Sequence, residues 1–227
     1  MARIINPVFG EIKGVVDGCY TKKLRNKIYI AACPKRLKKT MDDGSVGRRK
    51  KFSVTAQFAK AVRSLEPLEA VWKMNLGKCL TAHHAICKKN YPLSSPERPT
   101  EQNVITPEGF DPGIEKAEVY IDKISAVIPV LSAVSYAGQG VLLSLNALVC
   151  FFDAAGINPD RYQLFAFCRE FENYDFSESK TVLIDFSPEE KDLAGRYGKA
   201  LLYIALVVKG NDGRVIDYSS TYSKEIL

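Results

Sequence analysis

The clearest pattern along the chain is a change in hydrophobic periodicity between its first and second halves. From 46 to 74, apolar side chains recur every three or four residues, which predicts an amphipathic helix. The repeating positions are Val54, Phe58, Val62, Leu65, Leu68 and Trp72. Pro67 predicts a division into two helices, and Ser45 is the expected cap of the first. A further helical segment is expected over 76–89.

Before these helices, two short runs, 14–20 and 27–32, have the composition of β-strands. The very basic segment 21–26 between them is expected to be the link of a hairpin. Pro34 ends the second run, because proline cannot donate a hydrogen bond to a strand ladder.

Beyond Pro112 the pattern becomes strand-like. Seven runs stand out, at 115–121, 126–134, 141–152, 162–168, 180–186, 199–208 and 214–222. Seven strands separated by turns predict an antiparallel, immunoglobulin-like β-sandwich. Gly210-Asn211-Asp212-Gly213 predicts a hairpin between the last two runs, since these residues tolerate positive φ. Within 199–208, Leu202, Ile204 and Leu206 alternate with Tyr203 and Ala205, and this alternation is expected to put one of the two sets in the core.

Five prolines between 92 and 112, with little periodicity, predict a linker or long surface loop. The expected organisation is therefore a basic hairpin-plus-helix segment at 1–91, a proline-rich linker at 92–112 and a β-sandwich domain at 113–227. The predicted fold class is α+β.

Composition narrows the cellular setting. The chain has 227 residues, 46% of them hydrophobic, which suffices for a substantial core. Its first residues lack the apolar stretch of a secretory signal, and no run approaches the roughly 20 apolar residues that span a bilayer. We therefore expect synthesis in the cytoplasm and no membrane span. The six cysteines are expected to be reduced thiols, although Cys150 and Cys168 lie on predicted facing strands and could pair outside the cytoplasm.

The charges are divided unequally. Residues 1–90 carry 20 Lys and Arg against 6 Asp and Glu, whereas 91–227 carry 12 against 20. A chain with two oppositely charged ends can bind phosphate, an acidic partner protein or the acidic end of a neighbouring copy. The alternative is that the two halves neutralise each other within one fold.

Twelve cations within thirty residues form the strongest candidate for a partner or nucleic-acid contact. They are Lys22, Lys23, Arg25, Lys27, Lys35, Arg36, Lys38, Lys39, Arg48, Arg49, Lys50 and Lys51. A solvated face would intersperse acids, and only Asp42 and Asp43 do so. The acidic counterpart predicted for a neighbouring copy comprises Glu170, Glu172, Asp175 and Glu178. Nearby, Tyr174 and Phe176 are expected in the core, with exposed anchors for a partner as the alternative.

Catalytic and metal-binding patterns are weak. Cys79, His83 and Cys87 would share one helix face beside His84, but one straight helix cannot surround a tetrahedral zinc ion. The two histidines are adjacent, and the chain has neither a Gly-x-Ser-x-Gly motif nor a glycine-rich phosphate loop. We expect no enzyme activity, no cofactor and no metal.

Several short motifs together resemble those of a known family. They are Met1-Ala2-Arg3-Ile4, Gly14-Val15-Val16-Asp17-Gly18, Arg49-Lys50-Lys51-Phe52, Leu202-Tyr203-Ile204-Ala205-Leu206 and Asp212-Gly213-Arg214-Val215. With these motifs the chain is similar to a family of bacterial proteins of comparable length described only as a domain of unknown function. The resemblance implies a basic front element, an immunoglobulin-like or fibronectin-like sandwich and no known activity.

Similar N-terminal segments, in which a hairpin is followed by a basic helix, occur in phage virion proteins. The expected function is therefore a structural or assembly role in a virion or bacterial particle, as a homo-oligomer or part of a larger assembly. A nucleic-acid binder that contacts phosphates without reading sequence is the alternative.

Overall fold

The computed structural model describes residues 2–4, 15–16, 18–24, 27–33, 42–131, 141–154 and 161–226. The chain forms two compact units, Met1–Asp42 and Asp43–Leu227. The first unit is a four-stranded antiparallel sheet in the order β1-β4-β3-β2. Its strands are β1 (Ala2–Ile4), β2 (Val15–Val16), β3 (Cys19–Leu24) and β4 (Lys27–Ala32).

The predicted hairpin is present in this unit, but its turn is shorter than expected. Residues 21–24, predicted as a basic link, belong to β3 and pair with β4, with Leu24 opposite Lys27. The first predicted run instead contains a turn of its own at Gly18, whose φ of 71° suits a glycine. Lys22 and Lys23 of this segment therefore lie on a strand.

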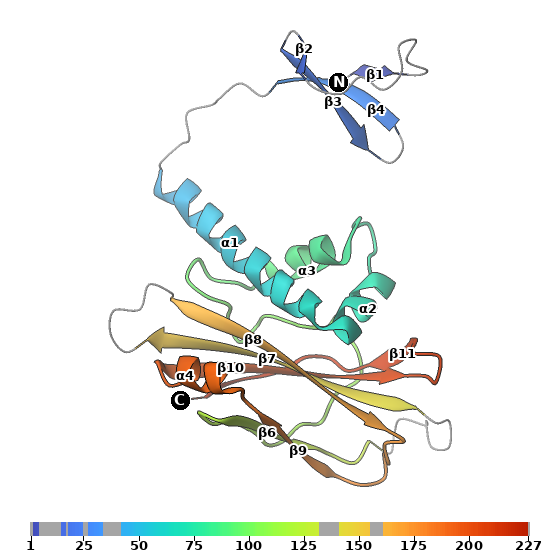
Figure 1. The fold of residues 1–227 in the computed structure, drawn as a ribbon, viewed down its shortest axis with the longest axis vertical. Coiled ribbons are helices and arrows are strands. Elements are labelled where there is room, and N and C mark those ends of the chain that lie inside the picture. The colour runs from blue at the N-terminus through green and yellow to red at the C-terminus, as the bar shows by residue number, and fades with distance from the viewer. Residues whose placement is uncertain are drawn as a thin grey trace. The chain divides into compact units, whose positions relative to one another are not determined.

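The second unit begins with three helices (Figure 1). They are α1 (Asp43–Ser64), α2 (Glu66–Met74) and α3 (Ala82–Asn90). As predicted, Pro67 separates the first two, in the first turn of α2 where its missing N–H costs nothing. Ser45 is the third residue of α1, so the prediction that it caps this helix is wrong. α3 starts six residues later than expected, because Gly77 has a φ of 53° and Thr81 caps the helix at His84 N.

A five-stranded antiparallel sheet forms the centre of this unit. Its strands are β7 (Leu142–Ala154), β8 (Tyr162–Glu172), β10 (Tyr197–Lys209), β11 (Val215–Tyr218) and β12 (Tyr222–Ile226). The order is β8-β7-β10, and both β11 and β12 pair with the far side of β10. The predicted last run is thus two strands. Ser219 lies between them and its hydroxyl accepts a hydrogen bond from Leu206 N at 2.8 Å.

The hairpin predicted at 210–213 is confirmed. Gly210 and Arg214 are joined by a backbone hydrogen bond of 2.9 Å, and Gly213 has a φ of 76°. This hairpin fixes the register of β10 against β11, with Val208 opposite Asp217.

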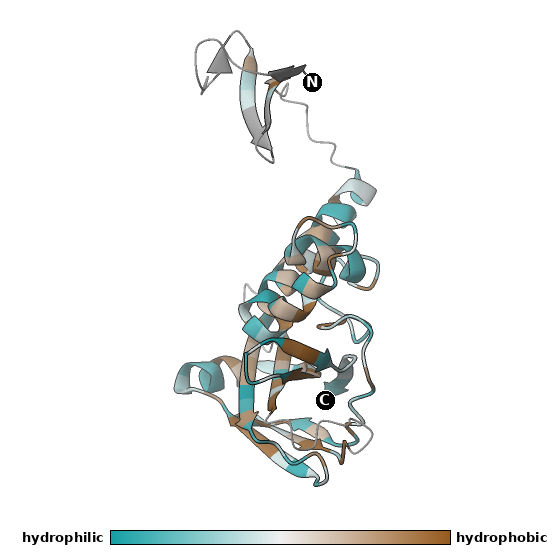
Figure 2. Cartoon of the chain, turned by 90° about the vertical axis from the view of Figure 1, so that its right-hand side faces the viewer, coloured by the Kyte–Doolittle hydropathy of each residue, from teal (hydrophilic) through white to brown (hydrophobic). Residues whose placement is uncertain are grey.

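Two layers cover the two faces of the central sheet. One face packs against α1, α2 and α3, and the other against a three-stranded sheet of β5 (Ala117–Val119), β6 (Lys123–Ile128) and β9 (Lys180–Asp185) (Figure 1). The short helix α4 (Pro188–Ala194) follows β9 and begins with a capping box at Ser187 and Glu190. Figure 2 shows hydrophobic colour along strands beneath the helices.

β10 belongs to both cores. Leu202, Ile204 and Leu206 face the three-stranded sheet, whereas Leu201 and Tyr203 face the helices. The prediction that only one of the two alternating sets lies in the core is therefore wrong, because Ala200 to Val208 are all buried. A continuous apolar run is the pattern of a strand that is covered on both faces, and the sequence of β10 follows this pattern.

The proline-rich segment is a packed connection and not a spacer between domains. Its Asn103 is 1% exposed and donates 2.9 Å hydrogen bonds to Asn90 Oδ1 and Ser94 Oγ. Trp72 Nε1 donates to Ile105 O at 2.8 Å, and Tyr203 OH donates to Thr100 O at 2.6 Å. The segment thus ties the helices to the sheet, and the two compact units of the chain meet at Asp42.

The coarse prediction of an α+β fold with antiparallel sheets is confirmed, while the immunoglobulin-like sandwich is not. One layer beside the central sheet is helical, which the sandwich prediction lacked. Cys150 and Cys168 are free thiols, and the alternative that they pair is wrong. Cys150 lies opposite Leu164 on β8, so it is four residues, or about 13 Å, from Cys168 along that strand, beyond disulfide reach.

Candidate interaction surfaces

The predicted basic cluster is only partly described by the structure. Lys22, Lys23 and Lys27 lie on β3 and β4. The other cations before α1, namely Arg25, Lys35, Arg36, Lys38 and Lys39, lie outside the described residues. The cations whose side chains can be placed are Arg48, Arg49, Lys50 and Lys51, all in the N-terminal part of α1. We call these four residues the α1 basic turn.

The α1 basic turn begins five residues after Asp43, the first residue of α1, and so lies beyond the first turn of the helix. The N-terminal end of a helix carries a partial positive charge, so cations there are unfavourable and anions are favourable. Asp43 is the acidic residue of the first turn of α1. Four successive cations just beyond this turn repel one another, so a bound external anion would lower their electrostatic energy.

The four side chains have different surroundings. Lys51 is half-buried, and its Nζ donates to Pro92 O at 3.1 Å and lies 5.3 Å from the centroid of the Tyr91 ring. Arg48, Arg49 and Lys50 are exposed. Lys51 thus holds the start of the proline-rich segment, while the other three cations face solvent.

A cavity of about 320 Å³ lies beside the α1 basic turn. We call it the Lys50 cavity; it is lined by Lys50, Ser53, Val54, Gln57, Pro96, Glu97, Arg161 and Tyr162. The hydroxyl of Tyr162 donates to Gln57 Oε1 at 2.7 Å, and burial raises the pKa of Tyr162 to about 12. Arg161 comes from the start of β8 and was not among the predicted contacts, because no local pattern links it to α1.

The predicted acidic surface is exposed at the opposite end of β8. Glu170 and Glu172 end this strand, and Asp175 and Glu178 follow in the connection to β9. We call these four residues the acidic turn. Tyr174 and Phe176, at 8% and 5% exposure, are core residues, so the alternative that they are exposed anchors is wrong. Hydrogen bonds from Ser177 lower the pKa of Asp175 and favour its charged form.

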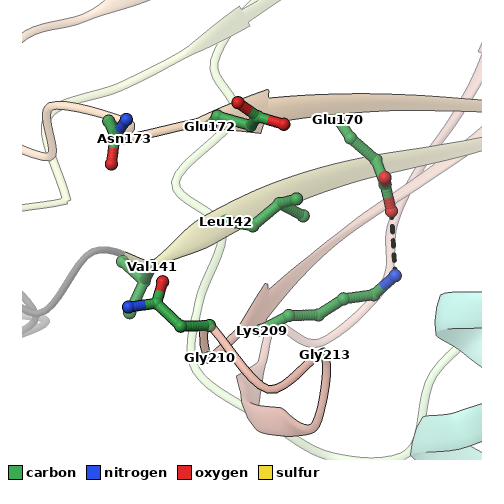
Figure 3. A pocket seen from close by; sticks show the side chains of 9 residues that line it. Val141, Leu142, Glu170, Glu172, Asn173, Lys209, Gly210 and Gly213 are labelled. Carbon is green, nitrogen blue, oxygen red and sulfur yellow. Dashed lines mark hydrogen bonds and ion pairs between the residues drawn. The ribbon is translucent and has the colours of Figure 1, made fainter.

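A second cavity, of about 480 Å³, adjoins the acidic turn. Figure 3 shows Glu170, Glu172 and Asn173 on one side and Lys209, Gly210 and Gly213 of the β10–β11 hairpin on the other. Lys209 Nζ lies 2.8 Å from Glu170 Oε1, so one acid is already paired within the chain. Glu172 carries the carboxylate of this cavity that remains for a partner.

Cys87 and His83 lie close together but do not form an activated nucleophile. Cys87 Sγ lies 3.6 Å from His83 Nε2. Burial raises the pKa of the Cys87 thiol and, more than the charge of Arg63, lowers the pKa of His83. Both shifts favour the neutral pair over a reactive thiolate with an imidazolium. Cys79 lies before α3, outside the helix face on which it was predicted.

Within the described ranges, no group of three or more His, Cys, Asp or Glu is placed to hold a metal ion. The same part of the chain contains no helix that is both long and apolar enough to cross a membrane.

Comparison with known proteins gives no family. No protein-family model matches the chain, and no curated protein is similar to it in sequence. Among solved structures, two of the beta-glucosidase from Kluyveromyces marxianus match in part, at 14% and 15% identity. These matches cover 56% and 50% of this chain but only 15% and 14% of the beta-glucosidase, with TM-scores of 0.21 and 0.19. Such scores are too low to carry an argument about fold or activity.

Proposed function

We propose that this chain is a non-enzymatic structural or assembly protein that docks onto neighbouring subunits through its basic residues. The observation that carries the proposal is the presence of two exposed surfaces of opposite charge on one compact unit, the α1 basic turn and the acidic turn. The resemblance to virion proteins favours a phage virion or bacterial surface particle as the setting.

Charge complementarity supports docking between copies. Within the part of the chain that the structure describes, Arg48 and Lys50 have no ion pair, and neither does Glu172 or Glu178. Separated charges of opposite sign steer the association of copies and set their orientation. The double-layered core beneath them supplies the rigid body that an assembly subunit needs.

Sequence-nonspecific nucleic-acid binding is the second candidate, and the same α1 basic turn favours it. Phosphates bind well beside clustered Lys and Arg. Binding of this kind would fall steeply as salt rises, whatever the nucleotide sequence.

The test is a fourfold charge reversal in the full chain, Lys22→Glu, Lys23→Glu, Arg48→Glu and Arg49→Glu. We expect sedimentation velocity to show assemblies for the unchanged chain and monomers for the variant, with the same circular dichroism. A matched control reverses four exposed lysines elsewhere, at Lys60, Lys78, Lys88 and Lys116, and should still assemble.

Three outcomes would contradict the assembly role. They are a monomer at every concentration, equal loss of assembly in both fourfold variants, and unchanged assembly in the first variant. Loss of DNA binding with unchanged assembly would select the nucleic-acid function instead.

A further inference from the structure

We propose that the Lys50 cavity binds a side-chain carboxylate from the acidic turn of a second copy, so that copies join head to tail. This inference rests on the proposed assembly function and names the contact that would perform it. It adds Arg161 and Gln57 to the residues that bind the neighbour.

The cavity brings together groups that are distant in sequence. Lys50, Ser53 and Gln57 are spaced by three and four residues, so they lie on one face of α1. Arg161 and Tyr162 approach from β8, and the hydrogen bond between Tyr162 and Gln57 spans 105 residues of sequence. Two exposed cations, Lys50 and Arg161, therefore line the same cavity of about 320 Å³.

The hydrogen-bonding groups suit a carboxylate. Because Gln57 accepts from Tyr162 through its carbonyl oxygen, its amide nitrogen remains a donor. Ser53 adds a hydroxyl, and Arg161 adds a guanidinium that can bind both oxygens of a carboxylate. Two like charges in one cavity also repel each other, so a bound anion lowers the electrostatic energy.

The charge balance favours one carboxylate over a nucleic-acid backbone. Glu97 also lines the cavity, so the two cations are offset by one acid. The remaining single positive charge matches a single carboxylate. A strand of nucleic acid would bring several phosphates close to Glu97, and that repulsion weakens phosphate binding at this site.

The geometry of β8 shows that the carboxylate must come from another copy. Tyr162 begins this strand and Glu172 ends it, and a strand of 11 residues spans about 33 Å. The cavity, which Tyr162 lines, and the acidic turn therefore lie at opposite ends of β8 and cannot meet within the chain; Figure 1 shows the course of this strand. A contact between unlike ends is heterologous, and it generates a ring or an open filament.

The closing experiment compares single charge reversals by sedimentation velocity. Arg161→Glu should weaken association about tenfold, since it replaces attraction by repulsion at a partly desolvated contact. Glu172→Arg should do the same from the other side. An equimolar mixture of the two variants should recover association, because the reversed cavity then meets a reversed partner. Glu97→Gln should strengthen association about twofold.

Lys88→Glu is the control, with the same charge change on an exposed α3 residue outside the cavity, and should leave association unchanged. Assembly that is sensitive to the fourfold reversal but not to Arg161→Glu would overturn the cavity contact and keep the assembly function. A chain that is monomeric at every concentration would overturn both. Failure of the mixture to recover association would show that Glu172 is not the partner group. If Arg161→Glu lowered binding of an unrelated single-stranded DNA and left assembly unchanged, nucleic acid would replace the second copy.

Discussion

Both faces of the central sheet are buried, but they are covered by different kinds of structure. On one face, Ile204 packs toward a small sheet formed by segments on both sides of β7 and β8 in the sequence. On the other, Tyr203 packs toward helices that precede the whole sheet, and its ring meets Phe58 edge-on at 5.3 Å between centroids. A single strand thus contributes side chains to two cores, and each covering layer is needed to bury one face of that strand.

The largest expected effect comes from removing the helical layer. A chain that begins at Pro112 lacks α1, α2 and α3, so Leu201, Tyr203 and Ala205 lose their cover. We expect it to be unfolded or aggregated, because exposed apolar patches of this kind are unstable in water. Far-ultraviolet circular dichroism and size-exclusion chromatography measure this. A soluble fragment with a cooperative melting transition would show that residues 113–227 fold independently, as the sequence pattern predicted.

The next effect compares one substitution on each face. Phe58→Ala on the helix side and Phe186→Ala on the sheet side each remove a nearly buried ring and should each lower the free energy of unfolding by about 3–5 kcal/mol. Because β10 belongs to both cores, each variant should unfold in urea in one transition seen by all probes. Two separate transitions in either variant would mean that the faces are energetically independent.

The smallest expected changes in the free energy of unfolding come from substitutions at two buried asparagines, Asn103 and Asn146. Asn103 is fully hydrogen-bonded, whereas Asn146 on β7 has an unpartnered Oδ1. Asn103→Ala should cost about 1–3 kcal/mol, because it leaves the Asn90 amide oxygen and Ser94 with fewer partners. Asn146→Val should change stability by less than about 1 kcal/mol, since it removes a buried acceptor that lacks a donor. Chemical denaturation of the two variants measures the difference, and an equal loss would contradict it.

Local patterns predicted the elements of this fold better than their packing. The three- and four-residue stripe from Val54 to Trp72 and the turn residues at 210–213 act over a few residues, so both were found correctly. The stripe shows that one helix face is buried but does not identify its partner. The contact between Phe58 and Tyr203 joins distant parts of the chain, and no pattern within either element specifies it.

The candidate surfaces show the same limit. The α1 basic turn and the acidic turn are evident from composition alone. The neutralisation of Glu170 by Lys209 joins residues 39 positions apart, and Arg161 reaches α1 from the start of β8. Electrostatic partners of this kind depend on strand register, which composition does not reveal.

The packing of helices on the central sheet also constrains how the chain folds during synthesis. α1 and α2 emerge from the ribosome before the central sheet, and β10, which packs against their apolar face, is translated more than 100 residues later. Until β7 is translated, Phe58, Leu68 and Trp72 have no sheet to pack against, and their core is complete only with β10. The nascent chain therefore passes through an interval with exposed apolar helices, a state that favours chaperone binding and aggregation.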